Sequence, residues 1–438
     1  MGRFTVFNST QLGASHLASG KPCQDSSLCY QSGDGKVQVA VVCDGHGGTT
    51  YVRSDVGSRL AADITLRNVL DFVADGSKTA LFVGCHGAVT AHPSDNMAEL
   101  QRKKSETPKL ITESDEEELA QAELFESQIA GIREQDYELT LLFGKIYTQW
   151  LAAIEADMVV TPFSETEAAL LGGKRPAKAY GTTLQCFVRT PLYWLAFHLG
   201  DGKITACMPD GTWREPVPWD CRCFLNLTTS LCDTNPVPEF RYAFDGTGDF
   251  PVSVVLGSDG LDDSWGTFDN LTTFYDSVVK MFADMERDKA VAELDDYLPR
   301  LSAKASRDDM SVAGILDLEA IAVLREQPDG EASEAQTDAA SQCRELISSA
   351  YRQSLDEYEE SERRRIDSLR MQRAVQTQLV SDEALAEMAD IERSENMADT
   401  EQSENRTDIE CSENMADTEQ SENRADIECS ENRADETE

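Results

Sequence analysis

Apolar residues in the first 320 positions recur at two spacings, which predict strands and helices. Short runs rich in β-branched residues, several of them followed by Gly or Asp, are typical of strands. They are Lys36–Cys43, Thr183–Val188, Tyr193–His198, Val252–Leu256 and Met310–Ile315. Longer runs predict helices over Val52–Val73, Ser114–Ile129, Arg133–Met158 and Leu271–Phe282. In the third run apolar side chains recur every three or four residues, so one face of that helix should pack against a core.

The pattern breaks in two places. Ala91–Glu118 is polar, and we expect a surface loop or an insertion there. After Leu318 the chain changes character, because Gln327–Thr337 has the composition of a linker and Ala339–Met388 is rich in helix-forming residues. The apolar positions of this last stretch have a weak heptad spacing, which leaves a coiled coil as an open alternative.

The C-terminal tail repeats an acidic unit. The tripeptide Ser-Glu-Asn begins at Ser394, Ser403, Ser412, Ser421 and Ser430. The repeat is nearly free of large apolar side chains, so it cannot bury enough surface to offset the entropy of ordering, and we expect disorder. A solubilising extension and an arm that binds a protein partner both fit this composition. The predicted segments are a domain over 1–318, a linker and helical segment over 319–390, and the repeat tail over 391–438.

Composition narrows the function classes. The net charge of −41 over 438 residues argues against a nucleic-acid-binding protein, which needs a basic face. The sequence has neither an apolar run long enough for a membrane span nor a basic-then-apolar leader. Its twelve Cys form no CxxC pair, which favours a reduced, cytoplasmic setting over a disulfide framework or a zinc site.

Aspartates follow or precede several of the predicted strands. They are Asp25, Asp44, Asp201, Asp259 and Asp308. A single Asp there usually caps a turn, but the ends of neighbouring strands lie close together, so five could converge. Converging carboxylates repel one another unless cations neutralise them. Oxygen ligands of this kind select Mg²⁺ or Mn²⁺, so the sequence predicts a site for hard divalent cations.

Six motifs occur in an order that resembles the type 2C metal-dependent protein phosphatases, over about residues 8–316. They are Gly13–Asp25, Val41–Gly48, Tyr180–Thr183, His198–Gly202, Ser258–Asp263 and Ser306–Val312. The second motif contains Asp-Gly-His-Gly-Gly, which is moderately specific, whereas the six in sequence are strongly specific. The resemblance implies an α+β fold, a four-layer α-β-β-α sandwich of two antiparallel sheets flanked by helices.

The resemblance also implies two bridged Mg²⁺ or Mn²⁺ ions in a cleft between the sheet ends. By that match Asp44 bridges the ions, and the carbonyl of Gly45 binds one of them. Asp259 and Asp308 complete the shell of the other ion, and Asp25 holds the metal-bound water. This arrangement implies hydrolysis of a phosphoester by a metal-bridged hydroxide that attacks phosphorus in line.

Two further roles come from the same match. Asp201 would help to bind a third, weaker ion. His46 follows the metal loop and could protonate the leaving alkoxide, although a hydrogen-bond donor that stabilises the turn is the alternative.

The chain departs from the better-known family members near the first motif. Gln24 stands where they carry Glu, and the Arg that grips phosphate in them is missing, which leaves Lys21 and His16. The Gly-Asp turn continues with Gly202 and Lys203 instead of Ser-Arg. These changes resemble a bacterial branch of the family.

The sequence therefore predicts a metal-dependent serine/threonine protein phosphatase that acts in signalling on a phosphorylated protein, without nucleic acid or membrane partners. One alternative is a phosphatase-like regulatory binding module with weak catalysis. The four intact aspartates Asp25, Asp44, Asp259 and Asp308 speak against it. The other alternative is a phosphatase for a non-protein phosphoester.

Overall fold

The computed structural model describes residues 2–89, 116–218, 220, 223, 227–325 and 338–373, without the side chains of 89 and 116–133. Most of the predicted polar loop, the linker and the acidic repeat tail lie outside these residues and stay predictions. The chain divides into a compact unit, Met1–Asp356, and a second unit, Glu357–Glu438, whose described part is helical. The predicted segment boundaries at 318 and 390 stay predictions.

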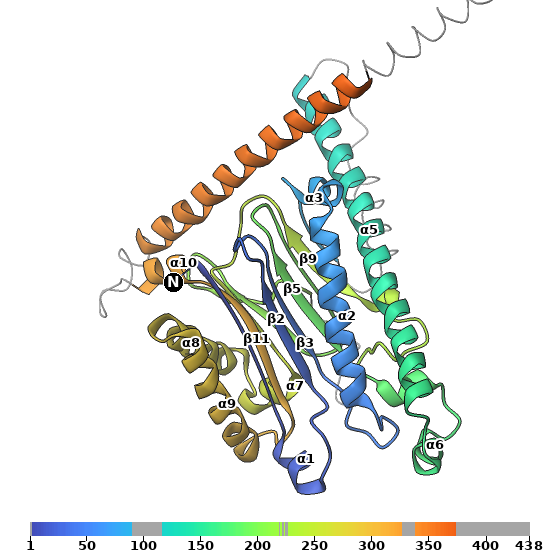
Figure 1. The fold of residues 1–438 in the computed structure, drawn as a ribbon. Helices are drawn as coiled ribbons and strands as arrows, with labels where there is room; N and C mark the ends of the chain where they lie inside the picture. Colours follow the sequence, from blue (N-terminus) through green and yellow to red (C-terminus); the bar gives the residue numbers. More distant parts are fainter. Residues whose placement is uncertain are drawn as a thin grey trace, which may run out of the picture. The chain divides into compact units, whose positions relative to one another are not determined.

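Two antiparallel sheets form the centre of the first unit (Figure 1). One sheet has the order β1-β11-β10-β7-β8. Its strands are β1 Phe4–Gln11, β11 Met310–Asp317, β10 Ser253–Gly257, β7 Lys203–Cys207 and β8 Trp213–Arg214. The N-terminal strand β1 pairs with the last strand, so the two ends of the domain close the same sheet.

The other sheet has the order β2-β3-β5-β6-β9-β4. Its strands are β2 Ser26–Gln31, β3 Gln38–Cys43, β5 Leu184–Arg189, β6 Trp194–Leu199, β9 Arg241–Asp245 and β4 His86–Val89. Every residue of β3, β5, β6 and β9 is buried, because this sheet packs against its partner sheet on one face and helices on the other.

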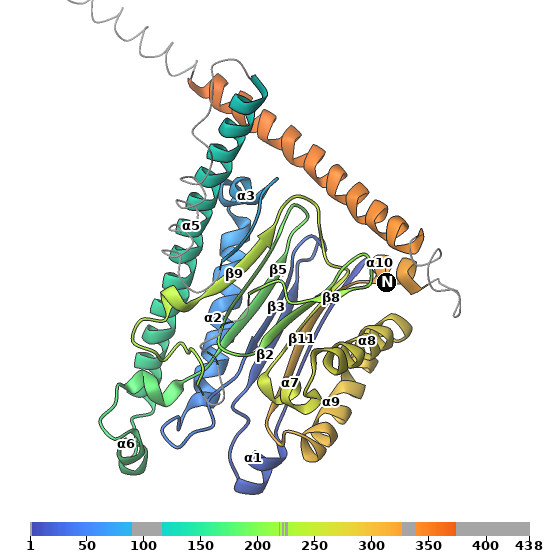
Figure 2. The ribbon, with the colours of Figure 1, turned by 180° about the vertical axis from the view of Figure 1, so that it is seen from behind.

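Helices cover both outer faces, as the two opposite views of Figures 1 and 2 show. On one side lie α2 Ser54–Ala74 and α5 Glu116–Val160, and on the other α7 Asp259–Trp265, α8 Phe268–Asp284 and α9 Arg287–Lys304. The shorter elements are α1 Ala14–Ser19, α3 Gly76–Phe82, α6 Glu165–Leu171, α10 Leu318–Arg325, and the 3₁₀ helices η1 Pro176–Tyr180 and η2 Val237–Glu239. The predicted fold class, a four-layer α-β-β-α sandwich, is confirmed.

Aromatic contacts join the helices to the sheets. Phe7 of β1 stacks on Phe282 of α8 with ring centroids 4.2 Å apart. On the other side Phe143 of α5 stacks on Phe240 at 4.4 Å, next to the start of β9. The apolar stripe of the predicted helix Arg133–Met158 therefore faces the sheet, as its spacing indicates.

One prediction of helix boundaries is wrong. The sequence suggests separate helices over Ser114–Ile129 and Arg133–Met158, but α5 runs unbroken from Glu116 to Val160. The predicted break surrounds Gly131, and a single Gly costs a helix only about 1 kcal/mol, which tertiary packing overcomes. Helix α9 was not predicted and contains Pro299 in its interior. Among the helices of the described residues, none has both the length and the apolar character needed to cross a bilayer.

The compact unit continues beyond the last strand. Residues 338–373 are helical, and Cys343 and Ile347 of this helix are buried in the same apolar core as α10. The hydroxyl of Tyr351 donates to the carbonyl of Gly246 at 2.6 Å, in the loop after β9. The start of the predicted helical segment therefore packs as part of the first unit.

Candidate metal centre

Strand pairing brings the predicted aspartates to one end of the two sheets. Ser26 of β2 pairs with Cys43 of β3, so Asp25 and Asp44, each one residue beyond, become neighbours. In the other sheet Gly257 pairs with Lys203 and with Val312. The segments that carry Asp201, Asp259 and Asp308 are therefore adjacent at the equivalent end of that sheet.

The carboxylates of this cluster interact strongly. Burial raises the pKa of Asp25 well above its ordinary value, and the charges of Asp309 and Asp259 raise it further. Burial likewise raises the pKa of Asp44, with added effects from Asp25 and Asp259, whose carboxyl also shares a hydrogen bond with Asp44. Such mutual increases mean that the full set of negative charges is unfavourable without a counter-ion.

Two other members of the predicted set have the same character. Burial raises the pKa of Asp259 to about 6, and the nearby charges of Asp201 and Asp308 add to this effect. Burial also raises the pKa of Asp201. Asp308 differs because its side chain is exposed, and its Oδ1 accepts a hydrogen bond from the backbone of Asp309 at 2.9 Å.

A divalent cation fits the chemistry of this cluster. The buried Oδ2 atom of Asp25 accepts no hydrogen bond among the described residues, and the charged groups that raise the pKa of Asp25 are the carboxylates of Asp309, Asp259 and Asp308. Mg²⁺ and Mn²⁺ prefer oxygen ligands, and a carboxylate oxygen that accepts no hydrogen bond is free to bind such an ion. Among the described residues, no three His, Cys, Asp or Glu side chains are arranged so that they could hold a metal ion. The structure thus shows a group of repelling carboxylates, with the metal-ligand roles of individual residues remaining a proposal.

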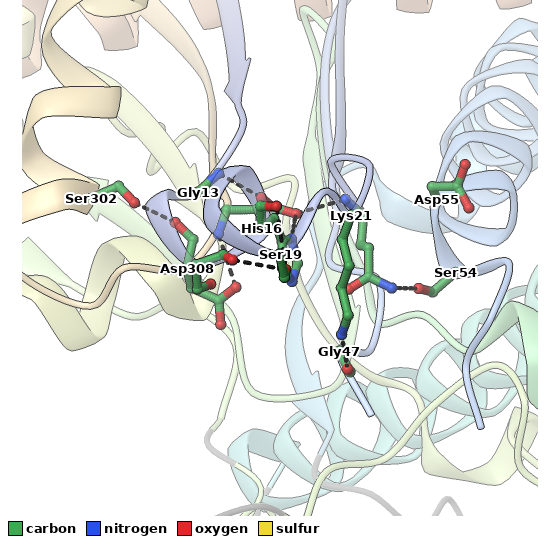
Figure 3. Close-up of polar contacts among 12 residues, drawn as sticks. Gly13, His16, Ser19, Lys21, Gly47, Ser54, Asp55, Ser302 and Asp308 are labelled. Carbon is green, nitrogen blue, oxygen red and sulfur yellow. Dashed lines mark hydrogen bonds and ion pairs between the residues drawn. The ribbon is translucent and has the colours of Figure 1, made fainter. Parts of the chain in front are cut away.

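Asp309 links the first motif to the last. Its buried carboxylate accepts hydrogen bonds from the backbone N–H of Gly13 and of Gln24, both at 2.6 Å, and its Oδ2 lies 2.8 Å from His16 Nδ1. Figure 3 shows Gly13 and His16 beside Asp308. Because Gln24 immediately precedes Asp25, these contacts fix the backbone that carries Asp25.

The turn that presents Asp308 is locally strained. Arg307 has φ of 66°, which an L-residue with a side chain rarely adopts. Its carbonyl accepts a hydrogen bond from Ser15 N at 2.8 Å, which holds the turn against the first motif. A Cβ at Gly13 would lie 2.3 Å from the backbone of Asp308, so only Gly permits this approach. Strain of this kind persists where surrounding contacts over-determine the backbone.

Gly45 lies in an equally close approach. A Cβ on it would come within 2.2 Å of the carbonyl oxygen of Gln24. Gly45 also forms a bridge with Thr182, whose hydroxyl donates to the carbonyl of Asp44 at 2.9 Å. The Gly in this motif is therefore required by packing, whether or not its carbonyl binds an ion.

His46 is held by hydrogen bonds. Its Nε2 lies 2.7 Å from Ser230 Oγ, and that hydroxyl donates to the carbonyl of Thr182 at 3.0 Å. The His46 ring therefore acts as the donor, which leaves Nε2 protonated. Burial, assisted by the charge of Lys178, lowers the pKa of His46 to about 4. These features agree with the turn-stabilising alternative, and the general-acid role stays a prediction.

Lys21 lies next to the loop that follows Asp44. Its ammonium donates to the carbonyl of Gly47 at 3.0 Å, and its backbone N–H donates to the carbonyl of His16 (Figure 3). The side chain is exposed and its partner is a neutral carbonyl, so a phosphate at the loop could compete for it. Phosphate capture by Lys21 stays a prediction.

Sequence reasoning gave no role to two residues of the cluster. Asp309 carries the three hydrogen bonds described above, and Asp263 of α7 contributes charge that raises the pKa of both Asp201 and Asp259. A signal for each existed, because Asp309 follows Asp308 and Asp263 belongs to the same motif as Asp259. Their different roles depend on which way each side chain points, and the pattern does not encode that direction.

The chain matches a family model described as Protein phosphatase 2C over residues 12–299. A comparison with curated protein sequences gives no match. The solved structures to which it is similar include the serine/threonine phosphatase Stp1 from Staphylococcus aureus, at 13% identity and a TM-score of 0.33, covering 72% of this chain and 95% of that one. Another is the catalytic domain of the serine threonine protein phosphatase PstP in complex with two manganese ions, at 15% identity and a TM-score of 0.36, covering 71% and 97%.

Proposed function

Because this chain belongs to the protein phosphatase 2C family, we propose that it is a metal-dependent serine/threonine protein phosphatase. The observation that carries the proposal is the cluster of Asp25, Asp44, Asp201 and Asp259, whose pKa values are all raised at one end of the sheets. A binding module has no need to maintain several buried or half-buried carboxylates that repel one another. An enzyme that uses divalent cations needs these carboxylates to hold the cations, and the bound cations relieve the repulsion among them.

Each residue has a proposed task. Asp44, Asp259 and Asp308 would hold two Mg²⁺ or Mn²⁺ ions, together with the Gly45 carbonyl, and Asp201 would contribute to a weaker third site. When bound, the ions would lower the pKa of water and neutralise charge on the phosphoryl group. Asp25 would orient the attacking water, because its unpartnered Oδ2 is buried at the cluster. Lys21 would bind a phosphate oxygen at the edge of the loop.

The direct test is turnover of a phosphothreonine peptide and of p-nitrophenyl phosphate, with Mn²⁺ and with EDTA. We expect turnover of both only with Mn²⁺, and loss of about a thousandfold or more in Asp44→Asn, because the most shared charge is removed. Equal activity in EDTA would overturn the metal-dependent assignment. Binding of the peptide without turnover in any metal would favour the regulatory module, and turnover of small phosphoesters alone would favour a non-protein substrate.

A further inference from the structure

A group of basic side chains borders the loop that follows Asp44, in a chain whose net charge is −41. Lys174 and Arg175 precede η1, and Lys178 lies within it; we call these three residues the basic rim. Backbone hydrogen bonds hold η1 against the loop, since Arg53 N donates to Ala179 O at 2.8 Å and His46 N donates to Gly181 O at 3.1 Å. The rim therefore lies beside the segment that begins with Asp44.

Among the residues that the structure describes, the rim contacts neutral groups and forms one long ion pair. Lys174 Nζ donates to Thr50 Oγ1 at 3.2 Å, and Arg175 Nη2 donates to the carbonyl of Cys232 at 2.8 Å. Lys178 Nζ lies 5.2 Å from the centroid of the Tyr51 ring and 3.7 Å from an oxygen of Asp233. A neutral acceptor leaves the cationic charge uncompensated, so the rim is left with net positive charge.

Two acids of α5 and α6 form ion pairs with a different cation, Arg53. Arg53 is almost fully buried and forms ion pairs with Glu167 at 2.8 Å and Asp157 at 3.2 Å. This contact lowers the pKa of Glu167 to about 2, which keeps it charged and paired. Asp157 of α5 and Glu167 of α6 are thus paired with Arg53, whereas Lys174 and Arg175 are exposed to solvent.

Position and charge together indicate what the rim binds. A phosphoprotein chain whose phosphorylated residue reaches Asp44 would pass next to the rim. Acidic side chains near the phosphorylated residue would be attracted by the positive charge of the rim. We propose that the basic rim binds Asp or Glu side chains that flank the phosphorylated residue, which selects acidic phosphoprotein segments as substrates. This inference rests on the proposed function and deepens it.

The test compares peptides that differ only in the flanking residues. One phosphothreonine peptide carries Glu on both sides of the phosphothreonine, and its partner carries Ala or Gln there. The double variant Lys174→Glu/Arg175→Glu should lower kcat/KM for the acidic peptide about three- to tenfold, which is the range for exposed charge pairs at a binding rim. Turnover of the neutral peptide and of p-nitrophenyl phosphate should stay the same. The acidic preference of the unmodified protein should fall as salt rises from about 0.05 M to 0.5 M.

The matched control is Lys280→Glu/Lys289→Glu, which makes the same charge change on α8 and α9 and should keep the acidic preference. If the reversal variant fails to fold, Lys174→Gln/Arg175→Gln replaces it, with about half the effect. Equal losses for acidic and neutral peptides would overturn the inference. A second result would also overturn it. If the reversal variant and removal of residues 391–438 both increase the turnover of every substrate, the rim binds the chain's own acidic tail and not the substrate. Absence of turnover of any phosphoester would instead overturn the proposed function.

Discussion

His16 Nδ1 and Asp309 Oδ2 are 2.8 Å apart, although the two residues are separated by 293 positions and both are buried. The same carboxylate accepts the backbone N–H groups of Gly13 and Gln24. Together these hydrogen bonds join α1 and the segment before β2 to the start of β11, and β2 and β11 lie in different sheets. The position of Asp25 relative to Asp308 therefore depends on a residue that is not a proposed metal ligand.

Although the two residues are adjacent, Asp309→Asn should lower the stability of the fold, whereas Asp308→Asn should weaken metal binding. The Asn amide of the first variant cannot accept from both backbone donors, so we expect a loss of about 1.5–3 kcal/mol in the free energy of unfolding. Asp308 is exposed, so Asp308→Asn should leave the stability of the metal-free protein nearly unchanged but weaken Mn²⁺ binding at least tenfold. Denaturant unfolding in EDTA and calorimetric Mn²⁺ titration measure the two effects. Equal stability of the variants would contradict the positioning role of Asp309.

The pKa of Asp259 predicts a pH dependence of the metal-free protein. In the folded state this pKa is about 6, above the value of about 3.9 for an unfolded carboxyl. The folded protein therefore binds the proton more tightly, and the resulting stability is present below about pH 4 and is lost as pH rises through about 6. Asp259→Asn resembles the neutral form. We therefore measure the melting temperatures of the variant and of the unmodified protein in EDTA. The variant's value minus that of the unmodified protein should increase between pH 4 and 7. A difference that stays constant would be inconsistent with the raised pKa.

His46→Ala separates the two roles left open for this residue. A general acid matters most for a poor leaving group, such as the alkoxide of phosphothreonine, and least for p-nitrophenolate. Given the contact with Ser230 and the lowered pKa, we expect similar losses for both substrates. Ser230→Ala should then give about the same reduction. A loss confined to the phosphothreonine peptide, with no effect of Ser230→Ala, would identify His46 as the acid.

Lys21→Ala tests phosphate capture. If the ammonium leaves Gly47 to bind a phosphate oxygen, the variant should raise KM several-fold with a smaller change in kcat. Lys36→Ala, on the turn between β2 and β3, is the control for loss of one positive charge. An unchanged KM would assign phosphate capture to another group.

Shortened chains test where the folded domain ends. A chain ending at Asp356 keeps Cys343, Ile347 and Tyr351, so its melting temperature should equal that of the full chain. A chain ending at Leu318 retains every proposed ligand, so the folded molecules should still turn over substrate. It loses the buried side chains of α10 and the following helix, however, which should cost at least about 2 kcal/mol of stability. Equal melting temperatures for the two would show that the 338–356 helix does not contribute to the domain's stability.

The sequence alone predicted the fold class, through its resemblance to a family, and five aspartates of the acidic cluster. Apolar runs such as Met310–Ile315 are fully buried strands, and their composition reveals them because a central strand must be apolar on both faces. The order of the motifs indicated the family. Gly recurs in these motifs where the backbone passes close to another segment, as at Gly13 and Gly45.

Only the tertiary structure decided which aspartate is buried and which is exposed. Asp308 and Asp309 are adjacent and chemically identical, yet one is exposed and the other is buried on Gly13, Gln24 and His16. The pairing of β1 with β11, together with the left-handed backbone at Arg307, sets this difference. The local sequence cannot predict this difference in burial, because the direction of a side chain in a turn depends on partners that are hundreds of positions away.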